Sequence, residues 1–390
     1  MERSVYMDHS ATTPMRCEAV DAMLPYFQER FGNASSVHAF GRQAREAMDD
    51  AREKVASLIG AQPGEIIFTG GGTESDNLAV AGAAHAYHEK GKHVIILAIE
   101  HHAVLNTSAA LQKVGFEVTE LPVDEHGLAD PEWLRALLRP DTALVSVMMA
   151  NNEVGVIEPI TELAAVARGA GAVFHTDAVQ AAGKVPVDVN ELGVDLLTLS
   201  AHKFHGPKGV GVLYRRKGVR LHPIIRGGHH EGNMRPGTEN VAGIVGLAVA
   251  LEMACLEMPK EAERLGRLRD RLQDGIIDRI PDVRVNGDPE KRLPHMVNVS
   301  IQGVEGEAML LTLDARGIAA SSGSACTSGT LEPSHVLTAM GIPPEVAHGS
   351  LRFSLGRMNT TEDVDYVIEV LPSVVERLRD MSPTYNRAKQ

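Results

Sequence analysis

The sequence predicts an α/β protein, with a mostly parallel sheet in a large domain and a smaller α+β domain after it. Between residues 66 and 214, short strand-like runs alternate with longer helical stretches, which is typical of a parallel sheet covered by helices on both faces. Polar residues follow several of these runs, at the strand ends where open α/β sheets bind ligands. A charged helical stretch from residue 260 leads into a second unit. We therefore place the large domain at residues 15–260 and the small domain at residues 1–14 and 261–390.

Two helices are expected before the alternating region. The first covers residues 14–30, and a loop follows at residues 31–36. The second covers residues 41–59, where apolar side chains recur at helical spacing. Gly60 stands where a glycine commonly ends a helix.

The alternating region is expected to supply a seven-stranded sheet. The predicted strands are residues 66–69, 93–97, 118–122, 144–149, 172–175, 194–199 and 210–214. The last of these follows the turn at Gly206-Pro207 and is expected to pair antiparallel with its predecessor. The predicted helices are residues 74–89, 131–138 and 161–168.

The remaining sequence predicts a long helical region and then the small domain. An apolar helix begins at Val241, and a charged helix covers residues 260–279. The small domain should contain strands at residues 296–301 and 351–355 and helices at residues 305–316 and 361–379.

Lys203 lies where the apolar run at residues 194–199 gives way to a turn. A lysine beside a hydrophobic strand end is partly desolvated, which lowers the pKa of its amine and frees it as a nucleophile. A lysine that forms a Schiff base needs these properties. Taken alone, the segment favours a solvated loop lysine.

The other strand ends supply a set of polar residues that gives Lys203 a chemical context. These residues are Gly72, Thr73, His101, Asn152, Asp177, Gln180 and His202. Gly72 and Thr73 lead into a helix N-terminus, where free N–H groups favour a phosphate. A buried Asp177 needs a cationic partner, which a pyridinium nitrogen provides. His101 is suited to stacking on a planar ring or moving a proton. With a Schiff-base lysine, these features together describe a site for pyridoxal 5'-phosphate.

Cys326 lies in a segment crowded with serine, glycine and threonine, residues 321–330, which is expected to be an exposed loop. An exposed thiol oxidises readily, so a free cysteine there favours a functional thiol over a structural one. Cys17 and Cys255 lie in helix-like stretches and are expected to be small core residues.

Composition excludes several classes of protein. The net charge of −13 leaves no basic stripe for nucleic-acid phosphates. Residues 1–6 show no apolar signal core, and the longest apolar stretch, residues 241–251, is too short to cross a membrane. Three cysteines form neither a disulfide framework nor a paired metal motif. We therefore expect a soluble protein of the reducing cytoplasm.

The chain resembles the cysteine desulfurases of the NifS/IscS type, which are fold-type I pyridoxal-phosphate enzymes akin to class V aminotransferases. The segment Ser-Ser-Gly-Ser-Ala-Cys-Thr-Ser-Gly at residues 321–329 carries the most specific part of the likeness. The other matching segments are residues 8–14, 31–33, 72–77, 151–153, 175–180, 200–203, 236–240, 330–333 and 352–357.

The resemblance implies a role for each candidate residue. Lys203 would hold the cofactor, Asp177 would pair with the ring nitrogen, Gln180 would contact the ring hydroxyl and His101 would stack on the ring. The implied phosphate ligands are Gly72, Thr73, Ser200, His202 and, from the other subunit of a homodimer, Thr238. Asn152 and Arg352 would bind the carboxylate of L-cysteine, since a guanidinium suits bidentate pairing. The Cys326 thiolate would take the substrate sulfur.

The resemblance also implies partners, and it leaves two rival functions open. The implied acceptor of the sulfur is an iron–sulfur scaffold protein, with which Cys326 could also hold a transient cluster. Another class V pyridoxal-phosphate enzyme, an aminotransferase or a selenocysteine lyase, would keep Lys203 and Asp177; an aminotransferase would have no need of Cys326. A non-catalytic sulfur carrier would need Cys326 but no complete cofactor site.

Overall fold

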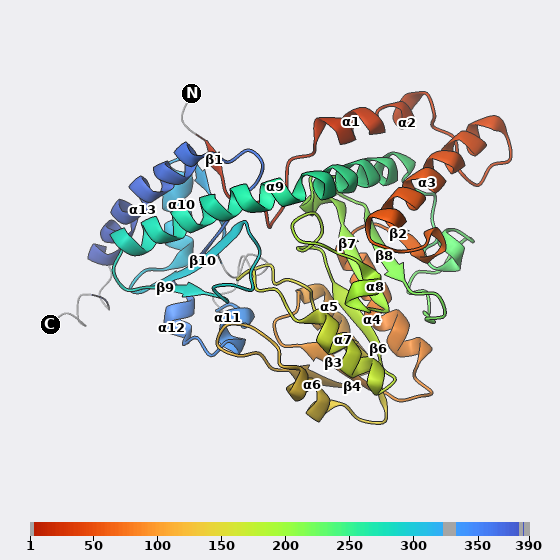
Figure 1. The fold of residues 1–390 in the computed structure, drawn as a ribbon, viewed down its shortest axis with the longest axis horizontal. Coiled ribbons are helices and arrows are strands. Elements are labelled where there is room, and N and C mark those ends of the chain that lie inside the picture. The colour runs from red at the N-terminus through yellow and green to blue at the C-terminus, as the bar shows by residue number, and fades with distance from the viewer. Residues whose placement is uncertain (1–3, 323–332, 382–384, 386–390) are drawn as a thin grey trace.

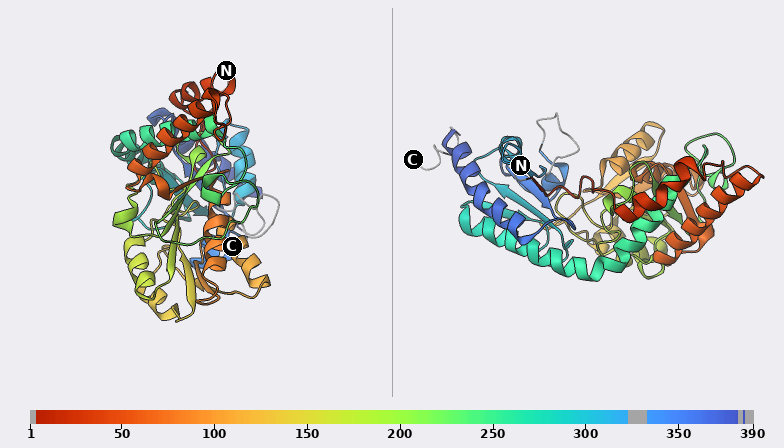
Figure 2. Two further views of the ribbon diagram at one scale, coloured as in Figure 1. Left: turned by 90° about the vertical axis from the view of Figure 1, so that its right-hand side faces the viewer. Right: turned by 90° about the horizontal axis from the view of Figure 1, so that it is seen from above.

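The computed structural model describes residues 4–322, residues 333–381 and residue 385. A seven-stranded sheet and a smaller sheet form two regions that the long helix α9 (Val241–Arg279) connects (Figures 1 and 2). The predicted boundaries at residues 15 and 260 remain a prediction. Two sheets with separate hydrophobic cores are observed in this chain.

The large sheet has the strand order β2-β8-β7-β6-β5-β3-β4. The strands are β2 (Ile66–Thr69), β3 (His93–Leu97), β4 (Glu117–Leu121), β5 (Thr142–Ser146), β6 (Val173–Asp177), β7 (Leu196–Ser200) and β8 (Gly211–Arg215). The strands β3 to β7 are parallel to one another, and β8 pairs antiparallel with both β2 and β7. The expectation of a mostly parallel seven-stranded sheet with an antiparallel partner at residues 210–214 is confirmed.

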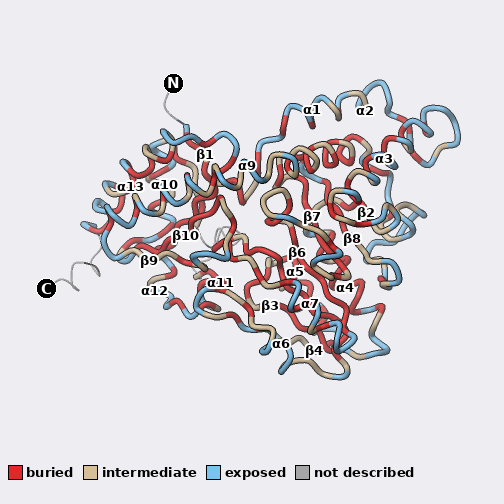
Figure 3. The backbone as a smooth tube through the Cα atoms, in the orientation of Figure 1, coloured by how far each residue is buried: buried red, intermediate tan, exposed pale blue. Residues whose placement is uncertain are grey.

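Helices cover both faces of this sheet, because successive side chains of a strand point to opposite faces. Ile96 and Leu144 pack in one core with α4 (Gly72–Ala86) and α5 (His102–Lys113). Ile95 and Val145 pack in the other core with α3 (Ala39–Leu58), α7 (Ile160–Gly169) and α9. The shorter helices around this sheet are α1 (Cys17–Met23), α2 (Pro25–Gln28), α6 (Pro131–Leu137) and α8 (Val189–Leu192). Figure 3 shows the central strands buried and the outer helices partly exposed.

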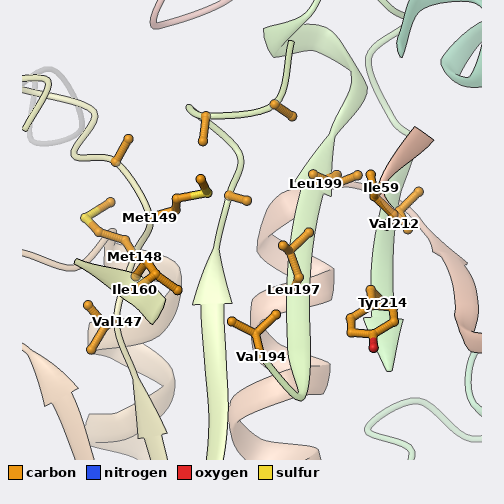
Figure 4. Close-up of a cluster of buried hydrophobic side chains, with 14 of the residues drawn as sticks. Ile59, Val147, Met148, Met149, Ile160, Val194, Leu197, Leu199, Val212 and Tyr214 are labelled. Carbon is orange, nitrogen blue, oxygen red and sulfur yellow. The ribbon is translucent and has the colours of Figure 1, made fainter. Parts of the chain in front are cut away.

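The second core of the large region takes its side chains from neighbouring strands. Leu197 and Leu199 of β7 and Val212 and Tyr214 of β8 belong to it (Figure 4). Each is at most 1% exposed. This dry packing fixes the end of β7, from which Lys203 follows directly.

The smaller sheet is antiparallel, with the order β12-β10-β9. Its strands are β9 (Val283–Asn286), β10 (Met296–Ile301) and β12 (Ser350–Ser354), and its helices are α10 (Gly306–Asp314), α11 (His335–Ala339), α12 (Pro344–Ala347) and α13 (Thr361–Met381). A separate parallel pair joins β1 (Val5–Tyr6) to β11 (Ile318–Ala319). As a result, Val5 and Met7 are buried in the same core as Leu272 and Phe353.

The structure corrects the helices expected around residues 14–30 and 241–279. The first is divided into α1 and α2 at Leu24. The second is a single helix, α9, which continues through Pro259. A proline removes one helical hydrogen bond, but here both halves of the helix are held by packing. Leu247 belongs to the large core and Leu272 to the small one.

By length and composition alone, the helix α9 is also long and apolar enough to cross a membrane. Half of its most apolar window is buried inside the protein, as in the core helix of a soluble protein. Its packing on α1 and α3 accounts for the apolar character that the sequence shows after Val241.

Candidate active site

The predicted phosphate cradle lies where β2 leads into α4. The helix begins at Gly72, one residue after Gly71, which has a φ of 147° that favours glycine. A Cβ atom at Gly72 would come within 3.0 Å of Val179 Cγ2 and 3.3 Å of Ser200 Cβ. Glycine therefore lets the N-terminus of α4 approach the end of β7. An open pocket of about 740 Å³ lies here, lined by residues that include Gly72, Thr73, Ser200 and His202.

Lys203 ends the short turn η2 (Ala201–Lys203) that follows β7. Its Nζ donates hydrogen bonds to the main-chain carbonyls of Ser10 and Ala11, the latter at 2.8 Å. Lys184 approaches from the other side, and its Nζ donates to the carbonyls of Gln180 at 3.0 Å and Lys203 at 3.2 Å. Burial and the charge of Lys203 lower the pKa of Lys184 to about 7. The Lys203 amine thus donates to main-chain acceptors, and the Lys184 amine holds the main chain of the same residue.

Asp177 and Gln180 lie at and just beyond the end of β6. Asp177 is 5% exposed, and its Oδ1 accepts a hydrogen bond from Val179 N at 2.8 Å. Burial raises the pKa of Asp177 to about 6, although this hydrogen bond and Lys203 act in the opposite direction. Gln180 Nε2 donates to the Ser10 carbonyl at 2.9 Å, while its buried Oε1 has no partner among the described residues.

The two predicted histidines are held in the uncharged state by their surroundings. His101 precedes α5, and its Nδ1 accepts from Ala103 N at 3.1 Å. Burial and then the charge of Lys203 lower the pKa of His101 to about 4. The same causes lower the pKa of His202 to about 4, and its Nδ1 lies 3.1 Å from Thr12 Oγ1. A neutral imidazole can accept or share a proton at the pH of the cell.

The two predicted carboxylate ligands, Asn152 and Arg352, are brought together by the fold. Arg352 lies on β12 and is 2% exposed. Its Nη1 donates to the carbonyl oxygen of Asn152 at 2.7 Å, and its Nη2 pairs with Asp8 Oδ1 at 2.8 Å. Its buried Nε has no hydrogen-bond partner in the described part of the chain. The guanidinium thus connects the small sheet to Asn152 and Asp8, and its Nε–H has no acceptor among the described residues.

Cys326 lies outside the described residues, which include the chain on each side of residues 323–332. Ser321 exchanges both main-chain hydrogen bonds with Arg352. Ser334 caps α11 and donates to a carboxylate oxygen of Glu153. Burial raises the pKa of Glu153 to about 7, although Ser334 and Arg352 lower it. Both ends of the segment that contains Cys326 are therefore attached beside Asn152 and Arg352.

Thr238 is the predicted phosphate ligand that the single chain does not bring to the pocket. It is exposed and is not among the residues that line the pocket. It belongs to the loop before α9, which two ion pairs attach to the large sheet. Glu231 binds Arg52 through both carboxylate oxygens, at 2.6 and 3.0 Å, and also accepts from Phe68 N. Arg235 pairs with Glu74 in the first turn of α4, at 2.8 Å.

The Glu231 ion pair gives a prediction about stability. Glu231→Ala is expected to lower the free energy of unfolding by about 3 kcal/mol, because it leaves a largely buried guanidinium and the Phe68 N–H without their acceptor. Denaturant titration measures the change. Glu132→Ala is the control, because Glu132 and Arg135 form an exposed pair whose loss should have no measurable effect. Equal midpoints for both variants would contradict this assignment.

Sequence reasoning missed the residues that hold the predicted ones in place. Asp8, Ser10 and Ala11 contact Arg352 and Lys203 from the N-terminal segment, and Lys184 contacts the main chain of Lys203. Residues 8–14 were noticed as a small polar segment, and that composition was the available signal. The composition of this segment gave no indication that it contacts Lys203, which lies more than 190 residues later in the sequence.

The fold is the α/β fold of fold-type I pyridoxal-phosphate enzymes, and comparisons with known proteins show the family of the chain. Residues 5–367 match the aminotransferase class-V family. The chain is 56% identical over 383 residues to the protein named cysteine desulfurase IscS of Dictyoglomus turgidum, covering 98% of this chain and 97% of that protein.

Two solved structures show the same likeness. One, described as a NifS-like protein, superposes with a TM-score of 0.91 at 38% identity and covers 96% of this chain and 100% of its own. Another, described as SspA in complex with cysteine, gives a TM-score of 0.80 at 35% identity and covers 90% of this chain and 99% of its own. The chain belongs to the aminotransferase class-V family and, within it, to the cysteine desulfurases of the NifS/IscS type.

Proposed function

We propose that this cysteine desulfurase uses pyridoxal 5'-phosphate to convert L-cysteine to L-alanine. The sulfur passes to Cys326 as a persulfide and from there to iron–sulfur cluster assembly. The observation that carries the proposal is the pocket itself. Its lining includes a helix N-terminus, Ser200 and His202, and the half-buried Lys203 and the buried Asp177 and Gln180 offer the other groups that this cofactor requires.

The residues present fit the cofactor. Gly72, Thr73, Ser200 and His202 would receive its phosphate at the α4 N-terminus. Asp177 would face the ring nitrogen, and the unpartnered Gln180 Oε1 would accept from the ring hydroxyl. The bound cofactor supplies an aldehyde for the Lys203 amine and a ring that accepts electrons from the substrate Cα.

The chain's own residues bind the substrate and move its protons. Arg352 and Asn152 would hold the carboxylate of L-cysteine, with Arg352 Nε as the available donor. Lys203 would take the proton from the substrate Cα, and the neutral His101 would help to relay protons. The Cys326 thiolate would attack the substrate sulfur, so that a new S–S bond forms while the C–S bond breaks. The electron pair of that bond stays on the three-carbon fragment, which is protonated and leaves as L-alanine.

One assay separates this activity from the two enzyme rivals. Purified protein loaded with cofactor should release alanine from L-cysteine and, with a thiol reductant, sulfide in equal amounts. An aminotransferase would instead need a 2-oxo acid and would give no alanine from L-cysteine alone. A selenocysteine lyase would act on L-selenocysteine and leave L-cysteine unchanged. Either of these outcomes would replace the proposed function.

The proposal includes a homodimer in which Thr238 reaches the phosphate site of the partner. Within one chain, Thr238 is exposed and is not among the residues that line the pocket. Large apolar side chains are exposed on the chain before and at the start of α3, which a partner subunit could cover. They are Met15, Leu24, Phe27, Phe31, Val37 and Phe40.

A mixing experiment tests this arrangement. Thr238→Ala should weaken cofactor binding about tenfold through loss of one hydrogen bond to a charged group. Hybrids of Thr238→Ala with Lys203→Ala subunits should regain one site of parental affinity, because that site takes Lys203 from one chain and Thr238 from the other. Unchanged affinity after mixing, or a fully active monomer by light scattering, would show that the site is not shared.

The acceptor and the compartment belong to the same proposal. An iron–sulfur scaffold protein is the proposed acceptor of the Cys326 persulfide, with Cys326 as a possible transient ligand of the cluster that forms there. The cytoplasm is the proposed compartment, because a reducing environment keeps the Cys326 thiol available.

A further inference from the structure

A line of buried polar side chains extends from the region of Asp177 across the large sheet. His175 lies two residues before Asp177 on β6, so both side chains are on the same face of the strand. Its Nδ1 lies 2.9 Å from Ser146 Oγ on β5, and its Nε2 lies 3.1 Å from Thr198 Oγ1 on β7. His175, Ser146 and Thr198 are completely buried. A polar path therefore crosses three neighbouring strands within the core.

Two carboxyl groups outside the assigned site end this path. Ser146 Oγ donates to Glu100 Oε1 at 3.3 Å, and Asp76 Oδ1 lies 3.7 Å from His175 Nε2. Glu100 follows β3 and Asp76 lies on α4, and both are at most 1% exposed. Glu100 Oε2 and Asp76 Oδ1 have no hydrogen-bond partner among the described residues. No lysine or arginine side chain pairs with either carboxyl group in the described part of the chain.

The surroundings of the three carboxyl groups differ, and this decides which one carries charge. Burial and the neighbouring Asp177 raise the pKa of Asp76 and of Glu100 well above the usual range, and Glu158 adds to the effect on Glu100. Burial lowers the pKa of His175 to about 3, so it offers no positive charge. Glu100 and Asp177 each accept a main-chain hydrogen bond, but Asp177 alone among the three is stabilised by the charge of Lys203, and its pKa stays at about 6.

We propose that Asp76 and Glu100 are positioning residues that stay uncharged in the folded protein and so leave one negative charge, on Asp177. The inference rests on the proposed function for the identity of the ring nitrogen that Asp177 would face. Three ionised carboxylates in one dry core would repel one another, whereas protonated ones can donate hydrogen bonds along the path. Asp76 and Glu100 thereby limit the negative charge beside the cofactor ring to Asp177. They also orient their neighbours on the path, His175 and Ser146.

The first test uses the protein without cofactor. The unfolded chain releases each of these protons at an ordinary pKa of about 4, whereas the folded chain keeps them. The stability that each group contributes is therefore fully present below about pH 4 and is lost as the pH rises toward the raised folded pKa. Between about pH 5.5 and pH 7.5, the unfolding constant of the parent should rise about tenfold per pH unit relative to Glu100→Gln, and likewise relative to Asp76→Asn.

Glu46→Gln is the control, because Glu46 is exposed on α3 and should show no such pH dependence. The proposal would be overturned if the ratio of the parent's unfolding constant to that of Glu100→Gln, and the ratio to that of Asp76→Asn, did not change with pH. Infrared spectra of the parent at about pH 8 give a measurement without any substitution. A band from protonated carboxyl groups is expected there. Its absence, or its full persistence in Asp76→Asn and Glu100→Gln, would also overturn the proposal.

The second test separates this inference from the proposed function. Asp76→Asn and Glu100→Gln imitate the uncharged carboxyl groups, so equilibrium dialysis should show pyridoxal-phosphate affinity within about threefold of the parent, whereas Asp177→Asn should lose tenfold or more, about 1.4 kcal/mol. If the parent binds no cofactor while the pH dependence is present, the proposed function fails and the charge arrangement stands. If the parent is active while Asp76→Asn and Glu100→Gln lose affinity as Asp177→Asn does, the inference fails alone.

Discussion

Lys203→Ala is expected to abolish turnover of L-cysteine, with a loss of at least about a thousandfold, because one side chain supplies both the attachment of the cofactor and the base for the substrate Cα proton. The fold should survive, since the hydrogen bonds that the Lys203 Nζ donates to Ser10 and Ala11 go to main-chain carbonyls. Sulfide release by the cofactor-loaded protein measures the effect, and circular dichroism checks the fold. Activity within tenfold of the parent would remove Lys203 from the mechanism.

Two neighbouring lysines provide an internal control for this assignment. Lys184 is buried behind Lys203, and Lys208 lines the same pocket as Gly72 and Ser200. Borohydride reduction should link the cofactor irreversibly to the peptide that contains Lys203. Mass spectrometry of the digested protein identifies that peptide. A label on Lys184 or Lys208 would show that the turn after β7 presents a different amine.

The strands of the large sheet could be predicted from the sequence because their local signals agree with their final environment. Residues 66–69 and 93–97 were predicted with the observed boundaries, since each is a short apolar run that becomes fully buried. The antiparallel partner at residues 210–214 was also predicted, because the tight turn at Gly206-Pro207 leaves no room for a crossover helix. The predicted site residues between Gly72 and Lys203 lie at or after the ends of strands in the large sheet. They therefore line the large pocket or lie at the strand ends beside it.

Other elements depend on contacts that no local pattern contains. The helix α5 was missed, although His101 caps it, because its apolar residues are interrupted by polar ones. The strand β1 has two residues and exists only because β11, more than 300 residues away, pairs with it. The helix α9 was divided at Pro259, because the packing that carries it past the proline comes from two separate cores.

The residues around the site show the same limit. Asp177 was predicted as a buried acid, but Asp76 and Glu100 looked like ordinary helix and loop residues. Their burial follows from the stacking of α4 on β6 and β7, which only the three-dimensional structure shows. Likewise, Arg352 was assigned to the substrate through a resemblance, whereas its ion pair with Asp8 could not be inferred from spacing.

Cys326→Ser is expected to separate the two halves of the reaction. Proton removal at the substrate Cα requires Lys203, but removal of the sulfur requires a thiolate that attacks it. The variant should therefore bind L-cysteine with nearly parental affinity, yet release sulfide at least about a hundredfold more slowly, since an alcohol is a far weaker nucleophile than a thiolate. Mass spectrometry should find a persulfide on the parent after incubation with L-cysteine and none on this variant.

The chain offers two matched controls and a geometric reason for this expectation. Cys17 is exposed on α1, so the expectation that it is a core residue is wrong, and Cys255 is half-buried on α9, where burial raises the pKa of its thiol. Both lie outside the proposed site, so Cys17→Ser and Cys255→Ser should retain parental rates. Ser321 is bonded to the main chain of Arg352, and the five residues from Ser321 to Cys326 can span at most about 18 Å. This length of chain is compatible with the proposed attack of the Cys326 thiolate on a substrate that Arg352 would hold. Parental rates of sulfide release by Cys326→Ser would make a simple lyase the better description of this protein.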